Sequence, residues 1–394
     1  MNLFKASNQW STRPNDERFG TLAELHEAVS SYRASAVEAA VTIPDLRVQA
    51  NGGEVELVGR ASKPARLTHW SFGQLSTSIG APASYLRALP ATLAAQNLNH
   101  GLSKLAASRA GSDAPDVAKR LLLHENGSLL VRAITGTGYT RIWNSDITKR
   151  LFALLEQGWQ VPPARPARAD QPGVRPATEA DVLRAGQVAG LSIKVGDPIA
   201  PAGLYASDHD LFAFLVDNEH RISEPGNPDG LARGFFISNS EVGAASFLLI
   251  RFLYRAVCGN HIVWDVKQVA EVRLRHVGRA DDRAFEEVRG TLTQYANESA
   301  SEDEARIKRA ANFTLAATKD EVLDRLFAIK NLGLSRKQLD AAYDLTVEHE
   351  PSSVDPNTAW GVAQGLTRLS QDTPFADERV AIDRAAGKVL SIAF

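Results

Sequence analysis

Cationic and aromatic side chains alternate along one short stretch of the chain. Cations that follow a phosphate backbone, together with rings on which bases stack, are the two ingredients of single-strand binding. The stretch therefore predicts contact with DNA, and with single-stranded DNA in particular. The alternative is that its tryptophans anchor the core while its arginines are solvated. The candidate residues are Arg132, Tyr139, Arg141, Trp143, Lys149 and Arg150.

The distribution of charge favours the same interpretation. The 394 residues hold 44 Lys and Arg against 46 Asp and Glu, a net charge of −2. Residues 57–184, however, hold 16 basic and 8 acidic side chains, a net of +8, whereas residues 1–56 have a net of −3. A polyanion-binding surface requires such a local excess. Alternatively, these cations are scattered and pair with acidic neighbours in the fold.

A second basic cluster includes Arg273 and Arg275, which alternate with apolar residues. As a strand this segment would present a basic face, and we include both arginines among the candidate DNA contacts. The alternative is that the acidic residues directly after it, among them Asp281 and Asp282, neutralise the cluster.

Three neighbouring side chains, Asp208, His209 and Asp210, have oxygen and nitrogen donors that could hold a divalent cation. The competing interpretation is a turn, because Asp and Ser side chains bond to nearby backbone amides, and we favour the turn. Cys258 ends an apolar run, so we expect a buried structural thiol rather than a nucleophile. No metal and no other cofactor is expected.

The sequence lacks several catalytic motifs. It has no P-loop, no H-E-x-x-H, no G-x-S-x-G, and no kinase or EF-hand signature. We interpret Gly136-Thr137-Gly138-Tyr139 as a turn after a strand. These absences favour a role other than that of a classical enzyme. The longest apolar run, Ala244–Cys258, contains two arginines and is too short for a membrane helix, and no signal peptide is evident. We expect a cytoplasmic protein that does not associate with membranes.

Periodicity predicts the elements that position these residues. A capping box at Thr21 begins a helix expected over 21–39. Glycines at the expected turns indicate two β-hairpins. The hairpins are expected over 46–58 and 119–134. Two helices are expected over 70–105, with a break near Pro82, and a further helix over 144–158, with later helix N-caps at Ser301 and Ser335. Strands are expected over 191–195, 204–206, 211–216, 234–238 and 247–258, with a continuation at 261–266.

These elements predict an α+β fold, with a β-hairpin-rich mixed core, packed helices and a helical C-terminal part. We divide the chain into four segments. They are an N-terminal α+β part with the basic segment (1–159), a Pro-rich loop or linker (160–180), a β-rich part that completes the core (181–268), and a helical C-terminal part (269–394).

Several motifs resemble a known family. Tyr85–Pro90, Val131–Ile134 with Tyr139, and above all Gly234–Gly243 are similar to the phage/plasmid-like proteins grouped as domain of unknown function 932. The resemblance covers roughly residues 20–290. The resemblance implies that the chain is a member of this family, but the shared motifs identify no catalytic residue. The family's association with phages and plasmids implies a DNA-related role in the cytoplasm of a bacterial host.

A weaker similarity, in outline only, is to single-strand annealing proteins of the eukaryotic recombination-mediator type, which assemble into rings. It implies a homo-oligomer that acts in recombination or replication. Two other functions stay open: a metal-dependent nuclease, and a structural or partner-binding mobile-element protein without DNA contact.

Overall fold

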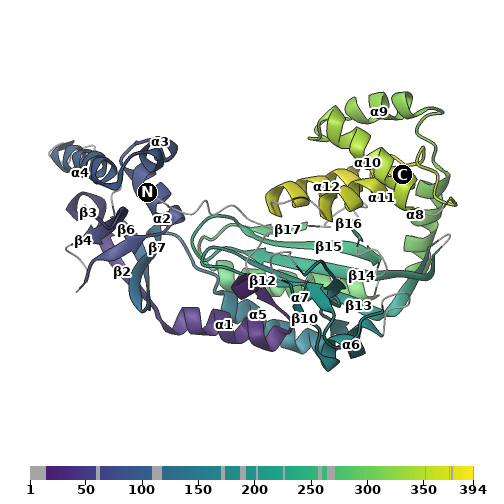
Figure 1. Cartoon of the computed structure of the whole chain (residues 1–394), viewed down its shortest axis with the longest axis horizontal. Helices are drawn as coiled ribbons and strands as arrows, with labels where there is room; N and C mark the ends of the chain where they lie inside the picture. Colours follow the sequence, from purple (N-terminus) through teal and green to yellow (C-terminus); the bar gives the residue numbers. More distant parts are fainter. Residues whose placement is uncertain are drawn as a thin grey trace.

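An eight-stranded antiparallel sheet forms the centre of the chain, which we describe from a computed structural model (Figure 1). A smaller lobe, built around a second sheet, stands at one end of the central sheet, and a group of helices stands at the other. Cys258 lies outside the described residues, so its predicted burial stays a prediction. The structure describes residues 15–58, 63–108, 118–169, 174–186, 192–200, 203–224, 227–255, 260–263, 271–297, 299–350, 352–371, 373 and 376–393.

The central sheet is apolar on both faces. Along its longest strands, Leu211, Ala213 and Leu215 point to one face, while Phe212 and Phe214 point to the other, and all five are buried. The strand order is β1-β12-β13-β14-β15-β16, with β8 also paired to β13 and β17 to β15. The strands are β1 (Arg18–Phe19), β8 (Trp159–Gln160), β12 (Leu204–Ala206), β13 (Leu211–Glu224), β14 (Asn227–Asn239), β15 (Phe247–Arg255), β16 (Asn260–Val263) and β17 (Glu271–Leu274).

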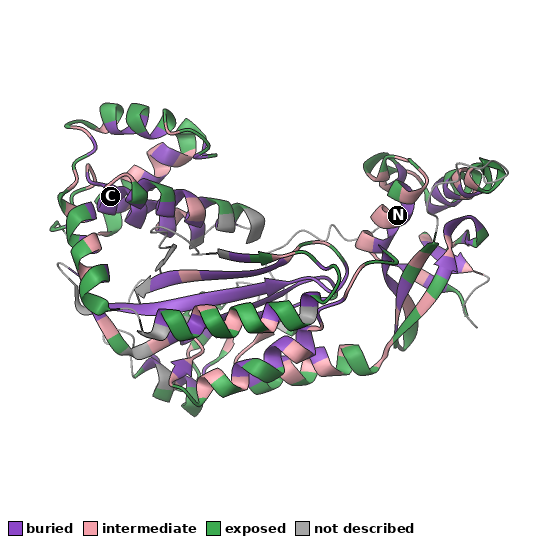
Figure 2. Cartoon of the chain, turned by 180° about the vertical axis from the view of Figure 1, so that it is seen from behind, coloured by how far each residue is buried: buried purple, intermediate pink, exposed green. Residues whose placement is uncertain are grey.

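Three helices cover one face of this sheet: α1 (Leu22–Ala34), α5 (Asn144–Leu155) and α7 (Ala280–Asn297). Leu25 of α1 and Leu151 of α5 pack into the same core as sheet residues of β13–β15. Thr21 begins α1 with the expected capping box, since its side chain accepts from the Glu24 amide and the Glu24 side chain accepts in return. Figure 2 shows the buried central strands above the outward-facing, exposed sides of these helices.

The N-terminal lobe is a six-stranded sheet in the order β2-β6-β7-β5-β4-β3, packed against helices on one face. Both predicted hairpins are present. They turn at Gly52-Gly53 and at Gly127, whose positive φ angles suit glycine. The elements are β2 (Ala36–Thr42), β3 (Arg47–Asn51), β4 (Glu54–Val58), β5 (Ala65–Leu67), α2 (His69–Ser78), α3 (Ala83–Ala88), α4 (Ala91–Ser108), β6 (Ala118–Asn126) and β7 (Ser128–Gly136).

The Pro-rich segment contributes regular structure where we expected a loop or linker. β9 (Arg165–Pro166) and β10 (Arg175–Pro176) flank β11 (Pro198–Ala200) in a three-stranded sheet, and α6 (Glu179–Ala185) lies between β10 and β11 in the chain. This small sheet has an apolar cluster of its own, in which Ile199 is fully buried.

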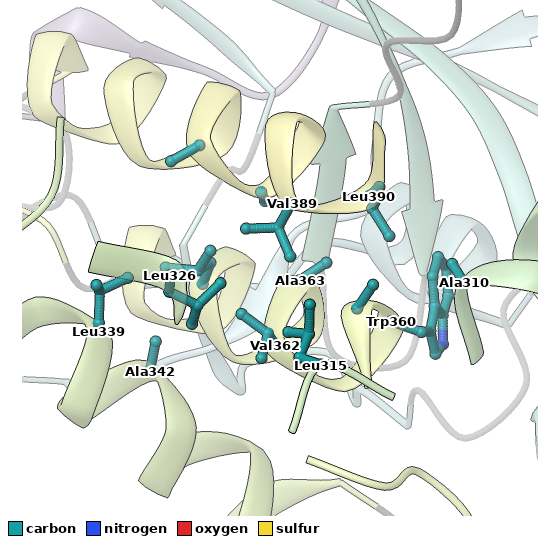
Figure 3. Packing of buried hydrophobic residues seen from close by; sticks show 14 of the residues in the cluster. Ala310, Leu315, Leu326, Leu339, Ala342, Trp360, Val362, Ala363, Val389 and Leu390 are labelled. Atoms are coloured by element: carbon teal, nitrogen blue, oxygen red, sulfur yellow. The ribbon is translucent and has the colours of Figure 1, made fainter. Parts of the chain in front are cut away.

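The C-terminal helices pack around a shared apolar core that includes Trp360 (Figure 3). Their core continues into the far ends of β13–β15 through residues such as Leu231 and Leu253, and the buried Arg233–Asp303 pair joins the two parts at 2.9 Å. Ser335 caps its helix as expected. The helices are α8 (Ala300–Asn312), α9 (Lys319–Phe327), α10 (Arg336–His349), α11 (Ala359–Gln371) and α12 (Ala376–Ser391).

Some predicted boundaries are wrong. Residues 36–39 belong to strand β2 rather than to the first helix, because pairing with β6 over seven residues outweighs the helical preference of the alanines. Residues 192–194 form no strand, and Pro90 adds a second helix break after Pro82. The N-cap position of α8 is Ser299 rather than Ser301, and the Ser299 side chain makes no capping hydrogen bond. In the described part of the chain, no helix has the length and apolarity needed to cross a membrane.

Candidate functional site

A buried network joins the N-terminal lobe to the central sheet. Nη1 of Arg132, on β7, lies 3.1 Å from Oε2 of Glu241, and each side chain is only 2% exposed. Arg132 also donates to the backbone oxygen of Asp208 at 3.0 and 2.5 Å. The second carboxylate oxygen of Glu241 accepts from the amide of Asn144, the first residue of α5, at 2.8 Å. A carboxylate at a helix N-terminus is electrostatically favourable. One ion pair thus connects three elements.

The loop after β14 supplies the rest of this network. The Ser240 hydroxyl donates to the backbone oxygen of His209 at 2.7 Å, and its own backbone oxygen accepts from the Tyr139 hydroxyl at 2.8 Å. The Asn239 amide donates to the side-chain oxygen of Asn144 at 2.7 Å. Residues 239–241, which carry the family resemblance, therefore act here by holding separate elements together.

The 207–210 segment forms the turn that we favoured. The Ser207 hydroxyl accepts from the amides of His209 and Asp210 and donates to the Asp210 carboxylate at 2.6 Å. Burial opposes ionisation of Asp208, but the hydrogen bond from His209 and the nearby charges outweigh it and hold the pKa of Asp208 below its usual value. Within the described ranges, no three His, Cys, Asp or Glu side chains are grouped as metal ligands would be.

A hollow of about 400 Å³ lies beside the network, and we call it the junction pocket. It is formed where β2, β6, the loop after β7 and the start of α5 meet one loop from the C-terminal half of the chain. Two of its lining side chains are arginines, two are large aromatics and one is a carboxylate. The lining residues are Glu38, Arg120, Thr137, Gly138, Tyr139, Thr140, Arg141, Trp143 and Gly278.

Arg141 is the most constrained cation of the junction pocket. Its side chain is 4% exposed, and its Nε donates to Glu38 at 2.8 Å. Its guanidinium carbon lies 5.5 Å from the ring centroids of both Tyr139 and Trp143, within cation–π range. Its Nη1 is buried and has no hydrogen-bond partner among the residues that the structure describes. A buried guanidinium with an unused donor is costly unless a ligand satisfies it.

Behind the pocket, Tyr139 and His276 form an uncharged aromatic stack. Their ring centroids are 4.9 Å apart and the rings are inclined by 10°. Burial lowers the pKa of His276 to about 4, so its imidazole is neutral near pH 7, and the Thr140 backbone oxygen, which can only accept, assigns the proton to Nδ1. Burial also raises the pKa of Tyr139, which stays protonated. The charges that line the pocket are therefore those of Glu38, Arg120 and Arg141.

The second basic cluster lies against the first. Tyr139 and Val277 form a β-bridge, the Thr140 amide donates to the His276 backbone oxygen at 2.9 Å, and the Thr140 hydroxyl donates to that of Gly278 at 2.5 Å. The two clusters, predicted separately from the sequence, are thus adjacent in the fold. Arg273 and Arg275 flank this contact, and both side chains are exposed.

Apart from Arg273 and Arg275, which lie outside the junction pocket, the predicted DNA contacts fall into three groups. Tyr139, Arg141 and Trp143 line one pocket. Arg132 is buried in its ion pair with Glu241 and, unlike Arg141, does not line the pocket, so we correct that assignment. Lys149 and Arg150 are exposed on α5 outside the pocket.

Sequence reasoning missed Arg120 and Glu38 as pocket residues. Arg120 lies two residues before Leu122 in a predicted hairpin, so strand alternation places both on one face. Alternation alone therefore predicts which face Arg120 shares, but it does not predict that this face lines a pocket. The packing of this face against α5 and the 239–243 loop could not have been inferred, because those segments are distant in the sequence.

Comparison with known proteins identifies one family. Residues 195–376 match the model of a domain of unknown function (DUF932), a range that runs from β11 to the first residue of α12. It includes the 239–243 loop but neither the N-terminal lobe nor α1 and α5. No curated protein and no solved structure matches the chain.

Proposed function

We propose that this chain, which carries a DUF932 domain, binds single-stranded DNA, with the junction pocket as the primary contact. The observation that supports this most directly is Arg141. Its unused Nη1 donor is buried in a pocket walled by Tyr139 and Trp143, and Arg120 lies exposed on the same wall. Guanidinium groups for phosphate oxygens and rings for bases are the combination that single-strand binding requires.

The pocket suits a phosphate with its attached base. Arg141 offers a fixed, partly desolvated donor, whereas Arg120 is free to follow the strand. Thr137 and Thr140 add hydroxyl groups, and among the described residues that line the pocket Glu38 is the one carboxylate. A phosphate oxygen that reaches Nη1 would therefore complete the hydrogen bonding of Arg141. The DNA-processing role in recombination or replication, the bacterial cytoplasm and a homo-oligomeric state belong to the same proposal.

Fluorescence anisotropy with a labelled single-stranded oligonucleotide tests the proposal. We expect Arg120→Ala to weaken binding about fivefold to tenfold and to lower the slope of log K against log salt by about 0.7, the value for one lost phosphate contact on a single strand. Lys104→Ala is the matched control. Lys104 is exposed on α4, which packs on the opposite face of the same sheet.

Glu38→Gln gives a second test with the opposite sign. The substitution removes the carboxylate that competes with phosphate for Arg141, so binding should become tighter by a few-fold. The proposal is wrong if the wild-type chain retains no single-stranded DNA at low salt, where phosphate contacts are strongest. It is also wrong if Arg120→Ala and Lys104→Ala behave alike.

A further inference from the structure

We propose that the bound strand leaves the junction pocket across the 276–279 loop and enters a second groove, between α5 and α7. This inference rests on the proposed function and extends it by naming a second subsite. The groove has a volume of about 770 Å³, compared with about 400 Å³ for the junction pocket. The two hollows share one wall, because Gly278 lines the junction pocket and the next residue, Arg279, lines the groove.

The shared wall is held in place by hydrogen bonds. The Thr140 amide and hydroxyl hold the backbone oxygens of His276 and Gly278, and Nη2 of Arg283 donates to the Val277 oxygen at 2.7 Å. A strand that crosses this loop would therefore meet a fixed surface. Gly278 itself has no side chain, its φ angle is 62°, and a Cβ placed there would meet no atom within 4 Å, so the loop leaves open space at this residue.

The rim of the groove carries an excess of positive charge. Arg150, Arg279 and Arg289 line it, against Asp282 and Glu286. Asp282 is already bonded to Arg279, at 2.7 Å. Arg150 and Arg289 are exposed, and neither forms an ion pair with the described residues. One of them comes from each helix, so the two cations face the groove from both sides and suit a polyanion.

Arg150 also supplies a surface on which a base can stack. Its guanidinium carbon lies 3.5 Å from the ring centroid of Phe285, so the ring orients the guanidinium plane. A guanidinium lying on an aromatic ring presents its other face to solvent, and nucleobases stack on such planes. Below it the floor is apolar, formed by side chains that include Leu154 and Trp159. Charge, stacking surface and continuity together favour a DNA strand as the occupant.

Two neighbouring residues of α5 provide the experiment. Arg150 lines the groove, whereas Lys149, which is next to it and also exposed, lines neither hollow. We would measure anisotropy with oligonucleotides of about 4 and about 16 nucleotides, the span of known single-strand site sizes. Arg150→Ala and Arg289→Ala should each weaken binding of the longer oligonucleotide about fivefold and leave binding of the shorter one unchanged. Lys149→Ala should change neither.

The outcomes separate the two proposals. If Arg120→Ala weakens the binding of both oligonucleotides while Arg150→Ala and Arg289→Ala weaken the binding of neither, the proposal of DNA binding stands and the proposed path through the groove is wrong. If Lys149→Ala acts as strongly as Arg150→Ala, the strand follows the outer face of α5 and the groove is again excluded. If Arg150→Ala instead changes the mass measured by light scattering, the groove receives a second copy of the chain. Absence of binding by the wild-type chain overturns both proposals.

Discussion

Removing the charge of Glu241 should loosen the junction between the lobe and the sheet. Both partners of the Arg132–Glu241 pair are 2% exposed, so Glu241→Gln leaves a buried guanidinium without its counter-charge. Breaking a buried pair in this way costs about 3–5 kcal/mol of unfolding free energy. The change also removes the negative charge at the N-terminus of α5, worth a further 0.3–1 kcal/mol or so.

Urea denaturation followed by tryptophan emission would measure this loss, since Trp70 and Trp143 pack in the apolar contact between the lobe and the 239–243 loop. Glu54→Gln is the matched control. Its partner is Arg66, and the two side chains are 38% and 44% exposed, so we expect a loss of about 0–1 kcal/mol. If Glu241→Gln costs no more than Glu54→Gln, the ion pair does not hold the junction and this reasoning is refuted.

Two further predictions concern the C-terminal helices. Gly365→Ala should lower the free energy of unfolding, measured in urea, by about 1–3 kcal/mol, because the added Cβ would collide with the Ala342 backbone oxygen of α10. The control is Gly290→Ala on α7, where the added Cβ has open space, so this change should be neutral or stabilising by up to about 1 kcal/mol. Equal effects of the two substitutions would contradict the packing of α10 against α11. Burial, opposed by Arg379 and Ser370, raises the pKa of Asp383 to about 6, so the folded state favours the protonated acid. The resulting stabilisation of up to about 3 kcal/mol is present below about pH 4 and is lost as the pH rises through 6. The free energy of unfolding, measured across this range, should therefore depend less on pH in Asp383→Asn than in the wild type. An unchanged pH profile in the variant would refute this assignment.

Local chemistry explains which parts of the fold were predictable. The two hairpins of the N-terminal lobe follow from glycine turns and alternation within about fifteen residues, and the Thr21 and Ser335 caps follow from four-residue motifs. The extent of the first helix was not predictable in the same way. Residues 36–39 become a strand only because β6, some eighty residues later, pairs with them.

The same distinction applies to the candidate site. Tyr139, Arg141 and Trp143 lie within five residues, so their convergence on one pocket could be inferred from spacing alone. The burial of Arg132 could not, because its partner Glu241 is 109 positions away, and an exposed and a buried arginine look alike in the sequence. The β-bridge between Tyr139 and Val277 is likewise a long-range pairing that no local sequence pattern predicts.

The position of α1 and α5 has a consequence for how such a protein can be rearranged by evolution. The family match begins at residue 195, yet α1 and α5, two of the three helices that cover one apolar face of its sheet, precede that point. A recombination event that transferred only the matched segment would leave this apolar face covered by α7 alone and Glu241 without its arginine. Exposed apolar faces of that kind promote aggregation. A breakpoint before α1 should therefore be tolerated better than one at residue 195, and the smallest stable unit extends beyond the matched range.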